Sequence, residues 1–215
     1  MIKKIIVRSF LFLVVSVTIL VAVLYYLIFL DSENKKSVYY DLSPSELSII
    51  QEGDILLRQG YGFFSRSIVK YQQAKYPVTH CAMFVKQKGK PGVIHSLSSS
   101  FSDFDGVQIQ PLQRFINESM PKTLMVVRFN GTQEDIHSLV QKTRAYLAKK
   151  IPFDHEFNRK DTSKMYCTEL FRNIFFETLG KDIFQNQLEV KDTEYYDVTT
   201  FLDTNYFTPI INHHL

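Results

Sequence analysis

The chain has 215 residues, of which 45% are hydrophobic and 22% charged, and this composition is typical of a folded globular protein and excludes an intrinsically disordered one. Lys3, Lys4 and Arg8 account for the whole formal net charge of +3, so the rest of the chain is close to neutral. Nucleic-acid binding requires a basic excess on the domain itself, and we therefore expect no nucleic-acid partner.

The first strong feature is the uncharged apolar segment 9–30. Its length suffices to span a hydrocarbon core of about 30 Å as a helix rising about 1.5 Å per residue. The run is longer than the apolar region of a typical signal peptide and lacks a clean A-x-A cleavage site, so we expect an uncleaved anchor. Basic residues precede it and Asp31 and Glu33 follow it, which predicts a cytoplasmic N-terminus and an extracytoplasmic domain, periplasmic or extracellular.

The remainder predicts one domain of alternating strands and helices. Ser43 and Glu46 form a capping box with Pro44 between them, and Thr132 with Asp135 has the same character, so a helix is expected after each cap. Period-two alternation or short apolar runs predict strands at 54–58, 78–86, 93–97, 107–109 and 124–129. Two further helices are expected, one at 65–76 and one from Thr162 or Ser163 to a C-cap at Gly180. The segment 190–215 has no clear pattern. The predicted class is α+β, a small antiparallel sheet packed by helices.

Cys167 falls in the first turn of the last predicted helix. The unpaired N–H groups and the positive dipole end at a helix start favour a thiolate and can bind a developing oxyanion. This is the environment that a cysteine nucleophile needs. The alternative is a buried structural cysteine, since free cysteine is among the most buried residue types.

Two histidines lie in neighbouring predicted strands. Alternation puts His80 and Cys81 on opposite faces, so if His80 faces Cys167 we expect Cys81 to point away from it, which argues against a Cys81–Cys167 disulfide. A short turn connects the two strands, so His95 is expected on the same face as His80. There it can hold His80 in the correct tautomer, as a carboxylate does in other triads. The alternative for a histidine in a strand is a satisfied core residue.

Zinc is a competing use of His80, His95 and Cys167, because all three side chains are good zinc ligands. Their spacing fits no compact structural zinc pattern and no fourth ligand is evident, so we expect neither a metal nor another cofactor. The remaining histidines are expected at the surface or, for His213 and His214, in a mobile end.

Three further residues are candidates for lining the site or supporting the oxyanion: Tyr166, Asp154 and Asp54. Tyr166 precedes the candidate nucleophile, and the two aspartates follow Phe153 and Gly53 in turn-like segments. Plain packing and turn formation are the alternatives for them. The aromatic residues Phe63, Phe64 and Phe101 either line an apolar groove or belong to the core.

The order of five segments resembles the NlpC/P60 superfamily, and more closely its circularly permuted papain-like branch, the YiiX/YebB-like hydrolases. These segments are GDIL at 53–56, THCAM at 79–83, VIHS at 93–96, PFD at 152–154 and YCTEL at 166–170. In the unpermuted enzymes the cysteine helix precedes the histidine strands; here it follows them, as in lecithin:retinol acyltransferase-like relatives. The resemblance covers about residues 51–180.

The resemblance implies a papain-like fold with a Cys–His–polar triad. Carried over by position, Cys167 is the nucleophile, His80 the base and His95 the third polar residue, whereas Cys81 stands where relatives often carry an aliphatic residue. The expected activity is hydrolysis of an amide or ester through a thioester, on a cell-wall peptide or a lipid or acyl substrate. The alternatives are a non-catalytic ligand-binding module on the same fold and a lipid acyltransferase-like thiol enzyme.

The expected organisation is a cytoplasmic tail at 1–8, a transmembrane anchor at 9–30 that attaches the protein to the membrane, a stalk at 31–42 and a permuted papain-like hydrolase domain at 43–215.

Overall fold

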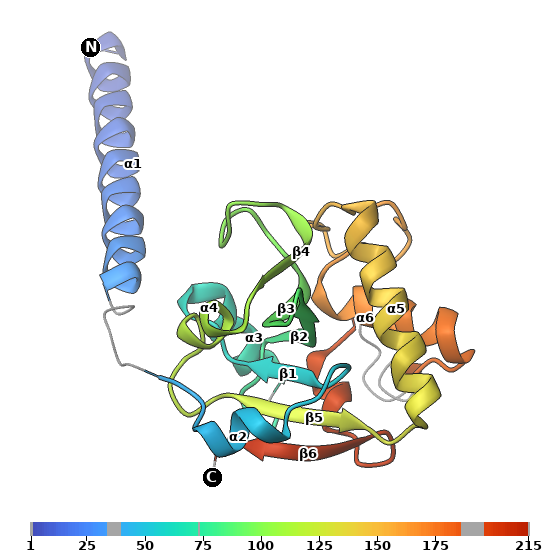
Figure 1. Ribbon diagram of the computed structural model, residues 1–215. Coiled ribbons are helices and arrows are strands. Elements are labelled where there is room, and N and C mark those ends of the chain that lie inside the picture. Colours follow the sequence, from blue (N-terminus) through green and yellow to red (C-terminus); the bar gives the residue numbers. More distant parts are fainter. Residues whose placement is uncertain (1, 34–39, 73, 186–195, 215) are drawn as a thin grey trace.

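The computed structural model describes residues 2–33, 40–72, 74–185 and 196–214. Most of the expected stalk and the first part of the C-terminal segment therefore lie outside the described residues. Helix α1 (Ile2–Glu33) extends away from the rest of the chain in Figure 1. Within it, Val7–Tyr26 has a mean hydropathy of 2.5 and none of it is buried. A membrane anchor and a signal sequence both have these properties.

The domain is built on one antiparallel sheet of six strands in the order β4-β3-β2-β1-β5-β6 (Figure 1). The strands are β1 (Ile55–Arg58), β2 (His80–Gln87), β3 (Lys90–Leu97), β4 (Gly106–Pro111), β5 (Met125–Phe129) and β6 (Phe207–Asn212). All but β6 were predicted from the sequence within a few residues. Strand β6 pairs with β5 at the edge, so the unpatterned C-terminal segment supplies a sixth strand.

Helices cover both faces of the sheet. On one face, α5 (Gln133–Lys149) and α6 (Cys167–Leu179) pack on a core that includes Cys81, Met83 and Ile94. On the other face, α4 (Leu112–Asn117) packs on a core that includes Ala82, Phe84 and Val93. The interpretation of the 78–86 strand as half-buried is therefore wrong: its residues are buried on both sides from His80 to Val85, because β2 lies in the middle of a sheet covered twice.

Two of the predicted helices begin where expected and two do not. Helices α2 (Pro44–Ile49) and α5 begin where predicted, each with a complete capping box. Helix α3 (Gly62–Gln72) begins and ends a few residues before the expected 65–76. The expected cap of α6 at Thr162 or Ser163 is wrong, because Ser163 is engaged in a local turn in which its N–H and hydroxyl donate to Asp161. Gly180 does end α6, with a φ of 65°.

The C-terminal histidines are not a mobile end. His213 Nε2 lies 2.6 Å from Glu46 Oε1, and its Nδ1 lies 2.5 Å from the Tyr40 hydroxyl. The His214 ring lies against the Tyr76 ring in a tilted arrangement, at a centroid distance of 5.3 Å. These contacts fasten the end of the chain to the beginning of the domain.

Candidate active site

Cys167 is the first residue of α6, and its helix start carries no side-chain cap. The N-cap residue is Tyr166, in an extended conformation and without a side-chain hydrogen bond to the helix. The pKa of Cys167 is lowered, first by a hydrogen bond from the Cys81 side chain and then by the backbone N–H groups of Cys81, Thr168 and Cys167 itself, against burial, which raises it. The open helix start therefore stabilises a thiolate.

Cys81 lies directly beside Cys167. The sequence predicted that Cys81 points away from Cys167 if His80 faces it; in the structure it is Cys81 that faces Cys167, because α6 packs on the face of the sheet to which Cys81 points. Cys81 is fully buried, and burial is the first cause of a pKa well above its usual value, with the hydrogen bond to Cys167 second. Both cysteines are free thiols. Cys81 thus acts as a neutral donor to its partner.

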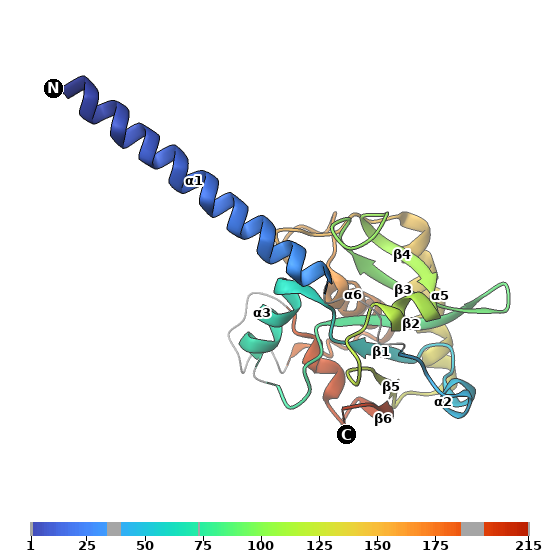
Figure 2. The same ribbon diagram turned by 90° about the vertical axis from the view of Figure 1, so that its left-hand side faces the viewer.

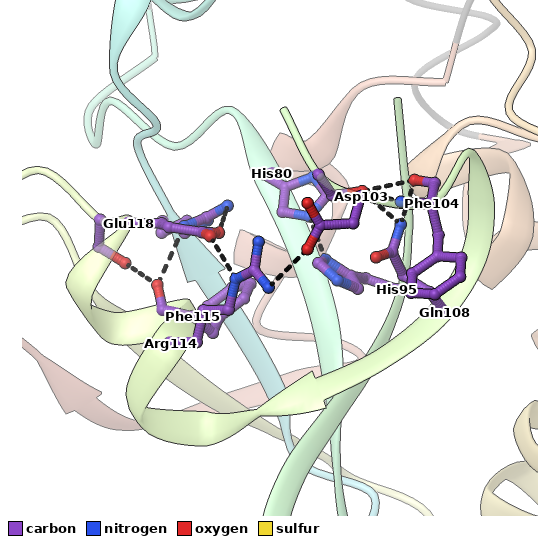
Figure 3. Close-up of polar contacts among 11 residues, drawn as sticks. His80, His95, Asp103, Phe104, Gln108, Arg114, Phe115 and Glu118 are labelled. Carbon is purple, nitrogen blue, oxygen red and sulfur yellow. Dashed lines mark hydrogen bonds and ion pairs between the residues drawn. The ribbon is translucent and has the colours of Figure 1, made fainter. Parts of the chain in front are cut away.

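The two histidines form a pair. His80 Nε2 and His95 Nδ1 are 2.8 Å apart, and the ring centroids are separated by 5.1 Å in an edge-on arrangement. Figure 3 shows the two rings meeting where β2 and β3 run side by side. The prediction that both project from the same face of the sheet is therefore confirmed.

The surroundings of the pair keep both imidazoles neutral. Burial lowers the pKa of His80 well below its usual value, helped by His95 and Arg58. Burial also lowers the pKa of His95 to about 3, helped by Arg58 and Arg114. A neutral imidazole has one donor and one acceptor nitrogen, so one histidine donates to the other. The second His95 nitrogen, Nε2, is buried and has no hydrogen-bond partner in the described part of the chain.

A buried arginine completes this cluster, and sequence reasoning missed it. Arg58 is 5% exposed; it donates from Nη1 to the Phe115 carbonyl at 3.0 Å and pairs through Nη2 with Glu118 at 3.3 Å. Its guanidinium lies 4.4 Å from the centre of the Phe115 ring, and that ring lies 6.0 Å from each imidazole. The signal available in the sequence was a charged residue at the end of an otherwise apolar strand.

The Arg58 cluster continues towards the connection between β3 and β4. Glu118 also accepts from Arg114 Nε at 3.0 Å, and Arg114 reaches Asp103 at 3.5 Å. Figure 3 shows these contacts running from Glu118 through Arg114 to Asp103, which is drawn next to the histidine pair. Burial, together with the nearby positive charges of Arg58 and Arg114, therefore accounts for the low pKa values of the two histidines.

The Cys167 thiol at the start of α6 lies against β2 at Cys81, the residue after His80. Among the residues that the structure describes, no hydrogen bond joins Cys167 to either imidazole. Cys167 instead contacts Cys81, the chain neighbour of His80. Burial lowers the pKa of Arg58 to about 10, opposed first by Glu118 and then by the attraction of Cys167. The structure therefore brings His80 and His95 together and puts Cys167 beside Cys81, whose side chain points to the opposite face of β2 from that of His80.

The other predicted site residues have structural contacts. Asp54 forms a two-point ion pair with Arg128, with both distances 2.8 Å, at the end of β1 away from Arg58. Asp154 accepts from the backbone N–H groups of Glu156 and Asn158 and so braces the loop before α6. The Tyr166 hydroxyl accepts from Tyr196 N at 2.8 Å and its ring is buried.

The buried acid Glu169 is the second site residue, after Arg58, that sequence reasoning missed. Glu169 lies in the first turn of α6, and burial followed by repulsion from Asp154 raises its pKa to about 7. Its Oε2 has no hydrogen-bond partner within the described residues. The motif that contains Glu169 was noticed, but its burial depends on segments distant in sequence.

Comparison with known proteins gives a family. The family model described as "permuted papain-like amidase enzyme, YaeF/YiiX, C92 family" matches residues 49–205. Among solved structures, the chain is similar to one described as the crystal structure of metalloprotein yiiX from Escherichia coli O157:H7, with a TM-score of 0.57 and 20% identity over 75% of this chain and 97% of that one. No curated protein matches the chain.

The description of that structure as a metalloprotein prompts a test for metal ligands here. Within residues 2–33, 40–72, 74–185 and 196–214, no three His, Cys, Asp or Glu side chains are grouped so that they would hold a metal ion. The described residues therefore do not fit a metal centre. The family match spans Arg58, both paired histidines and Cys167. With an α+β fold of one antiparallel sheet, and with its cysteine helix after its histidine strands, this chain belongs to the permuted papain-like amidase family YaeF/YiiX.

Proposed function

We propose that this protein is a cysteine amidase in which Cys167 is the nucleophile, His80 the general base and His95 the residue that orients it. The observation that carries the proposal is the lowered pKa of the Cys167 thiol, which is caused first by a hydrogen bond from the Cys81 side chain on β2 and then by the backbone N–H groups of Cys81 and of Thr168 and Cys167 at the uncapped start of α6. A lowered thiol pKa raises the thiolate fraction, and the thiolate is the attacking species. The other cysteine, Cys81, lacks this property, because its pKa is raised.

The hydrogen bond between the histidines supports the assignment of the base. If His80 Nε2 carries the proton and donates to His95 Nδ1, then Nδ1 of His80 is left free to accept a proton. Because both rings are neutral, His80 is ready to act as a base at neutral pH. His95 then fixes the tautomer and the ring orientation of His80.

The proposed reaction has two halves. The Cys167 proton moves to His80 as the sulfur attacks the carbonyl carbon, and the N–H groups of Cys167 and Thr168 at the helix start donate to the oxyanion. The bond from carbon to the leaving nitrogen or oxygen then breaks, His80 protonates the leaving group, and a thioester remains on Cys167. Water, deprotonated by His80, attacks the thioester and releases the acid and the free thiol. Cys81 and His80 point to opposite faces of β2, so the proposal requires that the Cys167 side chain leaves Cys81 and reaches the His80 ring at the end of the strand as substrate enters.

The family supplies the amide as the bond class, and the substrate is proposed to be a peptide, with a lipid or acyl compound as the alternative. We further propose that α1 anchors the protein as a single membrane span, with residues 1–8 in the cytoplasm and the domain outside. An alkaline phosphatase fusion after residue 215 is expected to be active, because that enzyme requires export. The unshortened mass of the isolated chain would show that α1 is retained.

A non-catalytic binding module is the second candidate function. The specific observation in its favour is that no described hydrogen bond joins Cys167 to an imidazole. It predicts ligand binding without turnover, and thus no difference in hydrolysis between the wild type and a Cys167→Ala variant.

The test uses the fact that the chain has two cysteines. Cys167→Ala leaves Cys81, and Cys81→Ala leaves Cys167, so intact mass after iodoacetamide treatment assigns the reactive thiol. We expect fast labelling of the wild type, severalfold slower labelling of Cys81→Ala, and no labelling of folded Cys167→Ala. Hydrolysis of p-nitrophenyl acetate is expected to follow the same pattern. Undiminished hydrolysis by a folded Cys167→Ala variant would refute the proposal.

A further inference from the structure

Helix α3 exposes three large aromatic side chains. Phe63 is 70% exposed, Phe64 67% and Tyr71 63%, although the sequence allowed these phenylalanines to be groove-lining or core. With about 3.6 residues per turn, positions 63, 64 and 71 lie on one side of the helix. Isolated exposed aromatics are common, but several on one helix face form an apolar surface that calls for a partner.

The same side of α3 is basic. Arg66 and Lys70 are exposed there, next to Phe63 by helical spacing. The segment 59–79 contains Arg66, Lys70 and Lys75 and no acidic residue. We call Phe63, Phe64, Arg66, Lys70 and Tyr71 the α3 patch. The aromatic side chains of the α3 patch suit an apolar layer, and its basic side chains suit anionic groups where that layer meets water.

The opposite side of α3 is attached to the domain. Gln72 donates from Nε2 to Asp197 at 2.7 Å, and the Ser65 hydroxyl lies 2.8 Å from that of Thr79, the residue before His80. These bonds keep the inner side of the helix facing the domain. The aromatic side is therefore presented outward by a fixed helix.

The α3 patch lies next to the apolar N-terminal helix. α1 and α3 are in contact, and Figure 2 shows α3 beside the end of α1 that leads into the domain. The aromatic residues of α3 keep their high exposure although α1 is close. If α1 spans a membrane, α3 is held at the bilayer surface from which α1 emerges.

We infer that the α3 patch docks on the surface of an anionic phospholipid bilayer, as a second membrane contact beside α1. Aromatic side chains favour the boundary between lipid headgroups and acyl chains, and Lys and Arg nearby are attracted to anionic headgroups. The contact fixes the orientation of the domain, which a single tether does not. It rests on the membrane location proposed for α1.

The chain contains no tryptophan, so one substitution provides a selective fluorescent reporter. We would reconstitute the full chain with Phe63→Trp into vesicles of phosphatidylcholine and phosphatidylglycerol, with and without brominated acyl chains. The matched control is Phe176→Trp, which changes an exposed phenylalanine on α6, 45% exposed. We expect brominated lipid to reduce the emission of the Phe63→Trp reporter by about twofold or more and to leave the control nearly unchanged.

The charge requirement is tested in the same reporter chain. Arg66→Gln with Lys70→Gln is expected to reduce quenching in the anionic vesicles. Vesicles of phosphatidylcholine alone are expected to give weaker quenching that does not depend on these two residues. Equal quenching in both lipids would overturn the part of the inference that concerns anionic lipid.

Two results would overturn the docking itself. The first is a full chain that floats with the vesicles while its Phe63→Trp reporter is quenched no more than the control, because this would leave the anchor intact and remove the second contact. The second is a reporter that is shielded from iodide in detergent and insensitive to brominated lipid, which would show that a protein surface covers the patch.

Discussion

Helices α5 and α6 start in opposite ways, although each has an acid at the third helical position. In α5, the Thr132 hydroxyl accepts from Asp135 N, and Asp135 accepts in return from Thr132 N, which lowers the pKa of Asp135. In α6, Tyr166 provides no side-chain cap, and Glu169 is buried with its pKa raised to about 7. One helix start is satisfied by its own residues, and the other is left open.

The difference shows what each helix start is used for. The cap of α5 occupies the helix donors, so that start serves stability alone. The start of α6 keeps its donors for the Cys167 sulfur and, in the proposed mechanism, for an incoming carbonyl oxygen. A buried acid and an uncapped helix both cost stability, as expected where a fold supports a reactive group. The predictions that follow change one helix start or the residues that serve it.

The largest expected effect distinguishes the contribution of the α6 start to catalysis from that of the histidines. If the start of α6 alone activated the thiol, His80 would be dispensable. In the proposed mechanism, His80→Ala lowers p-nitrophenyl acetate turnover by about 10²–10⁴-fold, because it removes the general base. His155→Ala is the control, since His155 is exposed and contacts Asp105 at 3.0 Å and the Phe153 ring rather than the histidine pair. Equal losses in the two variants would exclude His80 as the base.

The second prediction concerns the buried acid of α6. The folded-state pKa of Glu169, about 7, lies above its ordinary value of 4.5, so between these values the folded state holds a proton that the unfolded chain releases. Stability therefore falls as the pH rises through this window. Glu169→Gln removes this pH-dependent loss. We therefore expect the free energy of unfolding of the variant, relative to that of the wild type, to increase by about 1–2 kcal/mol from about pH 5 to pH 8. The measurement is urea denaturation of both proteins at each pH.

The matching substitution in α5 is expected to act with the opposite sign. The pKa of Asp135 is lowered, so its carboxylate contributes stability that is present above its ordinary value of 3.8 and lost on acidification. Asp135→Asn should therefore destabilise the protein at neutral pH. A shift of the same sign in both variants would contradict the contrast between the two helix starts.

The third prediction removes the cap of α5. Thr132→Ala deletes the hydroxyl that accepts from Asp135 N, and we expect a loss of about 1 kcal/mol in the free energy of unfolding. The rate of iodoacetamide labelling at Cys167 should stay the same, because the α5 start does not contact the thiol. A changed labelling rate in the folded variant would link the two helix starts.

The smallest expected effect is on the pKa and the labelling rate of the Cys167 thiol. Cys81→Ala removes the first cause of the lowered Cys167 pKa, so the pKa should rise and labelling at neutral pH should slow severalfold. Cys81→Ser keeps a hydroxyl donor and should restore most of the rate. The measurement is the pH dependence of iodoacetamide labelling by intact mass. Identical profiles for all three proteins would show that Cys81 is only a packing residue.

Local patterns in the sequence predicted most of the fold. The capping boxes at Ser43 and Thr132 and the αL glycine at 180 act within one helical turn, so their effect is visible in the sequence. Thr162 and Ser163 are residue types that cap helices, yet Asp161 offers Ser163 a closer partner. Two local patterns competed there, and the sequence alone did not rank them.

The parts of the site that escaped prediction depend on which layer covers which face of the sheet. Alternation correctly put His80 and Cys81 on opposite faces but did not show that α6 packs on the Cys81 side. Arg58 acquires its role from Phe115 and Glu118, which lie 57 and 60 residues further along the chain. Such contacts arise from tertiary packing, which periodicity does not encode.

The hydrogen bonds of His213 to Tyr40 and Glu46 close the domain into a ring. A short linker between these ends, with a new opening in the exposed connection around residues 158–163, would yield a chain that starts with the cysteine helix and finishes with α5. Every strand would keep its neighbours. The order of the nucleophile and the histidines in the sequence therefore depends only on where the termini lie. A circularly permuted chain could form the same site with either order.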